Sequence, residues 1–160
     1  MQENAPDFGV ILEVLAKYEV DYIVVGGVCA VLLGAPVTTF DLDIVHSRSA
    51  RNIEHLNAAL EELEASYREH LPRIMMPDAQ ALKNAGHHLL LTRYGPLDIL
   101  GAIGDNDGYE QLIEHCEIID LGQDRIIRIL DLETLIRMKE KSARDKDQAM
   151  LNILRAMQTL

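Results

Sequence analysis

The sequence predicts a single mixed α/β domain of the α+β kind over residues 1–160, in which helices flank a mixed β-sheet. A chain of 160 residues is long enough for one domain with its own core. Its 48% hydrophobic and 26% charged residues are typical of globular proteins. Segments with a helical period alternate with short β-branched runs, and two later runs predict a hairpin instead of repeated strand–helix–strand units.

In the first half of the chain, apolar residues at helical spacing define the helices, and β-branched or alternating residues define the strands. The pair Gly26-Gly27 stops the first strand, and Gly34 with Pro36 stops a short helix. Ser49 is a helix-capping residue type before an apolar stripe. The predicted elements are a helix over 7–18, a strand over 21–25, a helix over 28–33, a strand over 40–45 and a helix after Ser49.

The second half begins with its least regular part, residues 66–86, which are polar and contain Pro72 and Pro77. A loop with a helical turn is expected there. The remaining predicted elements are strands over 88–93 and 97–102 around Tyr94-Gly95-Pro96, a helix over about 108–115, strands near 117–121 and 125–130, and a helical segment over about 131–160.

Composition excludes several classes of protein. A net charge of −11 opposes general coating of DNA, because most of the surface would repel a polyanion. Cys29 and Cys116 are expected to be core thiols, since two cysteines form no disulfide framework and no zinc-type cluster is present. Glycines and a proline interrupt the uncharged run from Tyr22 to Phe40, which argues against a membrane span. No secretory signal is visible, so a soluble cytoplasmic protein is expected.

Three aspartates are the candidate catalytic residues. In a strand over 40–45, Asp41 and Asp43 would point to one face, about 6–7 Å apart. Asp98 alternates with apolar neighbours in the hairpin strand and is the natural third carboxylate. If the two strands are neighbours, three acids converge, and they would repel one another unless a cation lay between them. Mg²⁺ is usually held by one or two carboxylates and substrate phosphates, so a magnesium site with room for a second ion is predicted.

The glycine pair extends this prediction to a phosphate ligand. A helix that follows Gly26-Gly27 would present free backbone N–H groups, and the lack of Cβ atoms would allow a phosphate to approach closely. Such a site suits a nucleoside triphosphate and in-line attack on phosphorus. Taken singly, a Gly-Gly pair is most often a turn and a DxD a solvated strand face. A dinucleotide site is not indicated, because no GxGxxG is present.

The order and spacing of these motifs resemble a known family. Gly26-Gly27, Gly34, Pro36, Thr39 and Asp41-Leu42-Asp43 are similar to the nucleotidyltransferase (DNA polymerase β-like) superfamily, and within it to small bacterial AbiEii/MNT-like proteins. The resemblance spans about residues 8–147 and is strongest over 22–45.

The resemblance implies the nucleotidyltransferase fold and a set of roles. Asp41, Asp43 and Asp98 would hold Mg²⁺, as one or two ions, with Mn²⁺ as a substitute. Asp98 would also deprotonate or orient the acceptor hydroxyl. Gly26, Gly27 and Thr39 would face the nucleotide. Two departures weaken the phosphate grip: many members have Ser where this chain has Gly27, and many have Arg where it has Val37.

The segment from Arg137 to Lys146 holds five of the 15 basic residues. It could close over a triphosphate or contact an acceptor nucleic acid, with Lys139 and Lys146 as the preferred nucleotide-binding residues. The alternative is a solvated helix face with i,i+4 pairs such as Glu140–Arg144. The nearby histidines are assigned no catalytic role, namely His46, His87 and His88.

The favoured hypothesis is an Mg²⁺-dependent nucleotidyltransferase that moves a nucleoside monophosphate from an NTP to a hydroxyl and releases pyrophosphate. The acceptor is left open among tRNA, a protein and a small molecule, and toxin–antitoxin members of the family motivate the first two. The absence of an obvious acceptor-binding domain suggests a partner chain or a homo-oligomer. The competing hypotheses are a non-catalytic module that binds a nucleotide or protein and a purely structural domain. The transferase hypothesis built on these three acids would fail if Asp98 lay well away from Asp41 and Asp43, or if an arginine held any of the three in a buried salt bridge.

Overall fold

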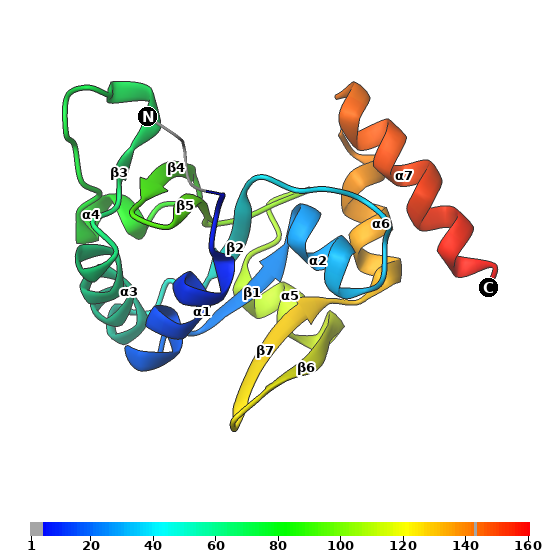
Figure 1. Ribbon diagram of the computed structural model, residues 1–160, viewed down its shortest axis with the longest axis horizontal. Coiled ribbons are helices and arrows are strands. Elements are labelled where there is room, and N and C mark those ends of the chain that lie inside the picture. The colour runs from blue at the N-terminus through cyan, green and yellow to red at the C-terminus, as the bar shows by residue number, and fades with distance from the viewer. Residues whose placement is uncertain (1–4, 143) are drawn as a thin grey trace.

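The computed structural model describes residues 5–142 and 144–160, which form a seven-stranded sheet with helices packed on it (Figure 1). The strand order is β3-β4-β5-β2-β1-β7-β6. The strands are β1 (Tyr22–Val25), β2 (Leu42–His46), β3 (Ser66–Tyr67), β4 (His87–Thr92), β5 (Gly95–Leu100), β6 (Cys116–Gly122) and β7 (Arg125–Leu130). The helices are α1 (Phe8–Lys17), α2 (Gly26–Leu32), α3 (Ala50–Glu62), α4 (Ala79–Leu82), α5 (Tyr109–Leu112), α6 (Leu132–Glu140) and α7 (Asp145–Gln158), with 3₁₀ turns η1 (Arg68–His70) and η2 (Ile113–His115).

The sheet is mixed, as the sequence predicts. Strand β2 is parallel to β5, and β1 is parallel to β7, while the other neighbours are antiparallel. The predicted hairpin is β4–β5, and β5 lies directly beside β2. The register pairs Asp43 with Asp98, so the strands that carry these two acids are neighbours.

The core lies along the central strands. Ile23, Ile44 and Ile99, from β1, β2 and β5, are each completely buried, and burial of such side chains is the main source of stability. Helices α1 and α3 pack together, and α2 lies between β1–β2 and α6. Figure 1 shows α3 and α7 at opposite ends of the molecule, with the β6–β7 hairpin extending away from the body.

Most predicted elements are present, with a few differences in their bounds. Ser49 caps α3 by accepting a hydrogen bond from the Asn52 N–H at 3.2 Å. The glycine pair forms the first turn of α2, although the sequence predicts a helix only from residue 28. Strand β2 begins at Leu42, so Asp41 lies just before the strand and not within it. The predicted helix over 108–115 divides into α5 and η2, and the C-terminal helical segment divides into α6 and α7.

Residues 66–86 contain more regular structure than the predicted loop. They form the short edge strand β3, the turn η1 and the single-turn helix α4. Cys29 is buried as predicted, whereas Cys116 is only partly buried. Within the described ranges, 5–142 and 144–160, no helix is both long enough and apolar enough to cross a membrane.

Candidate active site

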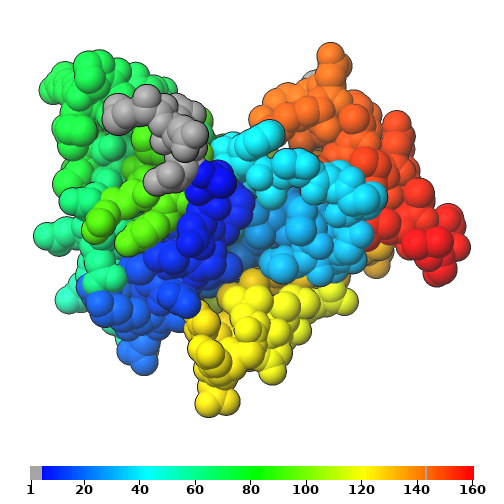
Figure 2. All heavy atoms as spheres, viewed as in Figure 1, coloured from blue at the N-terminus to red at the C-terminus, as the bar shows by residue number. Residues whose placement is uncertain are grey.

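Two adjoining cavities lie between the strand ends and the C-terminal helices. The first cavity has a volume of about 490 Å³ and the second about 350 Å³. Figure 2 shows a notch in the upper outline of the molecule between green atoms on one side and the orange start of α7 on the other, with cyan atoms at its floor. The residues that line both cavities are Asp43, Lys139, Arg144 and Asp147.

The two cavities have different walls. The first is bounded by the loop after β5 and by the buried face of α6, and it is mainly apolar apart from the shared residues. Its other lining residues include Gly26, His87, Leu100, Ile103, Asn106, Leu135 and Met138. The second is bounded by the segment before β2 and by α7, and its other lining residues include Gly27, Thr39, Phe40, Asp41, Lys146, Met150 and Ile153.

Asp43 lies where the cavities meet and has an incompletely satisfied carboxylate. Among the described residues, no hydrogen-bond partner reaches its buried Oδ1 atom. Burial, and then the negative charges of Asp98 and Asp41, raise the pKa of Asp43 well above its usual range, while the charge of Lys139 opposes that rise. Removing a carboxylate from water without a partner is costly, so this side chain favours a bound proton or a cation.

The glycine pair is required by the close approach of two side chains. Gly26 has a φ of +67°, and a Cβ atom there would overlap the Asp43 carboxylate. A Cβ atom on Gly27 would lie 2.5 Å from Thr39 Oγ1. The serine that many similar proteins have at this position would therefore displace Thr39, which donates to the Asp41 carbonyl at 3.1 Å. Residue 27 therefore has no room for a side chain while Thr39 keeps this position.

Asp98 has a different environment from Asp43. It is 8% exposed, and its Oδ1 accepts a hydrogen bond from Arg68 Nη1 at 2.7 Å. Asp98 is not among the described residues that line either cavity. Within residues 5–142 and 144–160, no three His, Cys, Asp or Glu side chains are grouped so as to hold a metal ion. Arg68 engages the third acid in the salt bridge that the sequence hypothesis set as its failure, so the expected three-acid site is wrong, and any metal site here has to be built on Asp41 and Asp43.

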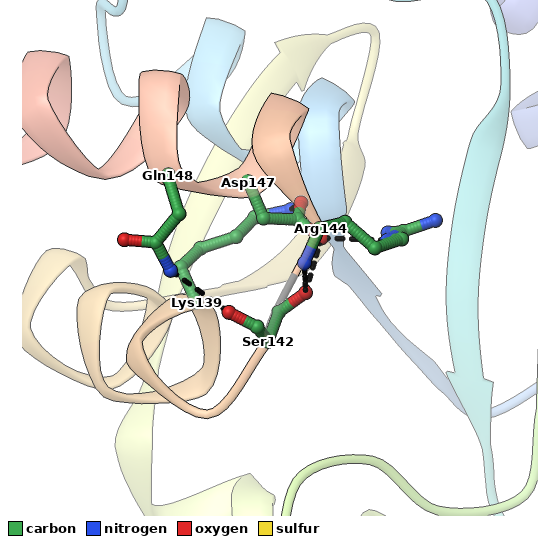
Figure 3. Close-up of polar contacts among 5 residues, drawn as sticks. All are labelled: Lys139, Ser142, Arg144, Asp147 and Gln148. Carbon is green, nitrogen blue, oxygen red and sulfur yellow. Dashed lines mark hydrogen bonds and ion pairs between the residues drawn. The ribbon is translucent and has the colours of Figure 1, made fainter.

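At the α6–α7 junction, side chains of the basic segment surround the buried carboxylate of Asp147 (Figure 3), and of these Arg144 is exposed. Asp147 accepts hydrogen bonds from Lys139 Nζ at 2.7 Å, Ser142 Oγ at 2.6 Å and Arg144 Nε at 2.7 Å. Burial alone would raise the pKa of Asp147, but these three hydrogen bonds outweigh it and hold the pKa well below its usual range. The cluster fixes Lys139 and Arg144 beside both cavities.

This cluster replaces the pairing expected for a continuous helix. Arg144 pairs with Asp147, and Glu140 pairs with Arg155 at 3.5 Å, so the alternative Glu140–Arg144 pair is not formed. The sequence singled out Lys139 and Lys146, and both line the second cavity. It did not identify Asp147, Ser142 or Arg144. A buried aspartate eight residues after a lysine, across a helix break, carries no periodic signal.

The oxygen atoms of Asp41 and Asp43 suit a site for one divalent cation with two carboxylate ligands, in place of the predicted site with three. Asp43 offers a buried oxygen that has no partner among the residues that the structure describes, and Asp41 lines the same second cavity. Mg²⁺ commonly takes one or two carboxylates and completes its shell with phosphate oxygens and water. Lys139, Arg144 and Lys146 supply positive charge around that cavity. The second cavity therefore has the chemistry to hold a cation together with a polyphosphate.

Comparison with known proteins identifies the fold. No family model and no curated protein matches the sequence. A crystal structure of TM1012 from Thermotoga maritima, assigned as a nucleotidyltransferase, is similar with a TM-score of 0.58 and 16% identity, over 96% of this chain and 91% of that chain. The antibiotic-resistance factor ANT(2″)-Ia is similar with a TM-score of 0.59 and 17% identity, over 94% and 82%. At these identities the similarity shows the fold, and this chain has the fold of nucleotidyltransferases.

Proposed function

We propose that this protein is a divalent-cation-dependent nucleotidyltransferase that transfers a nucleoside monophosphate from an NTP to a hydroxyl group. The proposal is carried by Asp43, which lies where the two cavities meet and near the positive charge of Lys139, and whose buried oxygen has no partner in the described part of the chain. In a nucleotidyltransferase fold, a buried carboxylate oxygen beside lysine and arginine side chains suits a polyphosphate that binds together with a divalent cation.

The second cavity is the proposed triphosphate site. It combines three basic side chains, Lys139, Arg144 and Lys146, with Gly27 and Thr39. Its other wall is apolar, formed in part by Phe40 and Met150, and suits the flat faces of a nucleobase. The first cavity, on the other side of Asp43, then receives the acceptor.

The proposed reaction is a displacement at the α-phosphorus. The acceptor oxygen forms a bond to this phosphorus, the bond between the α-phosphorus and the bridging oxygen breaks, and pyrophosphate leaves. The acceptor hydroxyl gives up its proton to water. Mg²⁺, held by Asp41 and Asp43, would supply charge stabilisation to the phosphate oxygens. Lys139 and Arg144 would orient the triphosphate, and Asp147 would keep those two cations in place.

A second candidate function is a non-catalytic nucleotide-binding or protein-binding module. The Arg68–Asp98 ion pair favours it, because the acid that would act on the acceptor hydroxyl is engaged by an arginine. The transferase and a nucleotide-binding module both bind a nucleotide and differ in turnover, whereas a protein-binding module binds no nucleotide, so nucleotide binding and product release need to be measured on the same variants.

The test combines calorimetry with a pyrophosphate-release assay. In the binding experiment, wild-type protein is titrated with each NTP, with and without Mg²⁺. In the turnover experiment, pyrophosphate release is measured with tRNA, with proteins of a cell extract or with small hydroxyl compounds as the acceptor. These acceptor classes are suggested by AbiEii/MNT-like and antibiotic-modifying proteins. Asp43→Asn is expected to lower pyrophosphate release at least about a thousandfold. Asp124→Asn, an exposed change in the β6–β7 turn, is the matched control and should have no effect.

The outcomes separate the candidates. Mg²⁺-dependent NTP binding with pyrophosphate release that is lost in Asp43→Asn supports the transferase. Mg²⁺-dependent binding without release, whichever acceptor is supplied, supports the binding module. Wild-type protein that binds no NTP in the presence of Mg²⁺ contradicts the proposal.

A further inference from the structure

Arg68, in the 66–86 segment, contacts Asp98, the third of the predicted acids. It is the first residue of η1, directly after β3. Its Nη1 atom donates to the Leu90 carbonyl and to Asp98 Oδ1, both at 2.7 Å. The guanidinium is thus held by the backbone of β4 as well as by the carboxylate, and the sheet fixes its position.

Its partner belongs to a pair of acids on neighbouring strands. Asp43 and Asp98 are opposite each other in the β2–β5 register. Two carboxylates at such positions repel unless positive charge is supplied. Arg68 supplies one such charge to Asp98, and an arginine keeps its charge at every pH that a folded protein experiences. The side chain of Asp98 is 11% exposed and that of Arg68 28%, so water screens this pair only weakly.

Asp43 and Asp98 consequently differ in what they can offer a cation. Asp43 lines both cavities and has a buried oxygen for which the described residues supply no partner. Asp98 already has a cation on Oδ1. A metal ion beside Asp98 would have to approach a fixed guanidinium, and the two positive charges would repel.

From this geometry we infer that Arg68 takes the place of one divalent cation, so that the site binds a single metal ion through Asp41 and Asp43, without Asp98 as a ligand. This inference rests on the proposed function. It gives Arg68 the role of a positioning residue, which keeps the Asp43–Asp98 pair together by neutralising one member. It also gives residues 66–86 a role, since they deliver this permanent cation to the sheet.

The test counts bound metal ions and does not depend on turnover. Mn²⁺ binding is measured by equilibrium dialysis in the presence of non-hydrolysable α,β-methylene NTP analogues, and free Mn²⁺ is quantified by its electron paramagnetic resonance signal. Wild-type protein is expected to bind one Mn²⁺ per chain, and Arg68→Met two. Arg68→Lys should still bind one, because a positive charge is retained. Arg93→Met is the matched control, since Arg93 forms an exposed pair with Glu64, and it should also bind one.

A second variant keeps the test decisive if Arg68→Met does not fold. Asp98→Asn should still bind one Mn²⁺, with a Kd within about threefold of wild type, and Asp43→Asn should bind none. Two ions on the wild-type protein, one ion on a folded Arg68→Met, or a loss of Mn²⁺ from Asp98→Asn would each overturn the inference while leaving the proposed transferase standing. Wild-type protein that shows no Mn²⁺-dependent binding of any analogue would instead contradict the proposed function, and this inference with it.

Discussion

Asp43 and Asp147 line the same two cavities, yet their surroundings are opposite. Asp147 receives hydrogen bonds from three donors, two of them cations. Asp43 has an oxygen for which the described residues provide no donor. The pKa of Asp147 is correspondingly lowered, whereas that of Asp43 is raised. One carboxylate is already satisfied by the fold, and the other is left for a ligand.

This contrast separates structural acids from candidate catalytic acids in a way that burial alone does not. Asp147 is 2% exposed and Asp43 is partly buried, so exposure would rank Asp147 as the more unusual residue. The number of hydrogen-bond donors to each carboxylate reverses that order, because a buried carboxylate with several donors stabilises the fold, whereas a buried carboxylate oxygen without a donor destabilises it. Substitutions at the two positions should therefore change stability in opposite directions.

The largest stability effect is expected for Asp147→Ala. It leaves the mostly buried Lys139 ammonium without a partner, and removing one member of a buried ion pair costs about 3 kcal/mol of unfolding free energy. Urea unfolding at pH 7 measures the change. Glu64→Ala, which removes the exposed pair with Arg93, should cost less than about 1 kcal/mol. Equal losses in the two variants would show that the α6–α7 cluster is not a structural anchor.

The same cluster should make stability sensitive to acid. Because the folded-state pKa of Asp147 lies below its unfolded value of about 3.9, its contribution is fully present above that value and is lost as the pH falls through the folded pKa. The stability difference between wild type and Asp147→Asn should therefore be constant from pH 6 to 8 and shrink only below about pH 4. A difference that shrinks already near pH 6 would assign the effect to another group.

A smaller effect of opposite sign is expected for Asp43→Asn in EDTA. The pKa of Asp43 is raised to about 7, so ionisation destabilises the folded state as the pH rises from about 4, the usual value, through 7. The variant should be more stable than wild type by about 1–3 kcal/mol at pH 8, with the gain falling towards zero near pH 4. Thermal unfolding across this range, with Asp124→Asn as the control, measures it. A less stable variant at pH 8 would mean that Asp43 has a partner in solution.

The strands of the central sheet could be predicted from the sequence, because the patterns that indicate them lie within each short segment. A β-branched run predicted β1, two short runs around Tyr94-Gly95-Pro96 predicted the β4–β5 hairpin, and Ser49 predicted the start of α3. The neighbouring placement of Asp43 and Asp98 followed from alternation within each strand and from the assumption that β2 and β5 pair. Similarity to a known family then supported the nucleotidyltransferase fold, which the structural comparison confirms.

The partners of the acids could not be predicted, because they depend on contacts between distant segments. Arg68 is 30 residues from Asp98 and follows a strand of only two residues, too short for an alternating pattern. Asp147 gains its partners only because the helix breaks between α6 and α7, where the sequence predicts continuous helical structure. The sequence therefore located the acids, and the tertiary structure determined which of them already has a cation.

The smallest effect on the free energy of unfolding is expected at Gly27, whose backbone packs against the side chain of Thr39. Gly27→Ala would bring a Cβ atom within 2.5 Å of Thr39 Oγ1 and 2.9 Å of Thr39 Cβ. The expected loss is about 1 kcal/mol, because the cost of overpacking exceeds the helix propensity gained by alanine. Gly86→Ala, which has no atom within 4 Å of its new Cβ, is the control. In a double-mutant cycle with Thr39→Gly, the Gly27→Ala loss should disappear, whereas an additive result would mean that the loss arises from α2 itself and not from the wall of the second cavity.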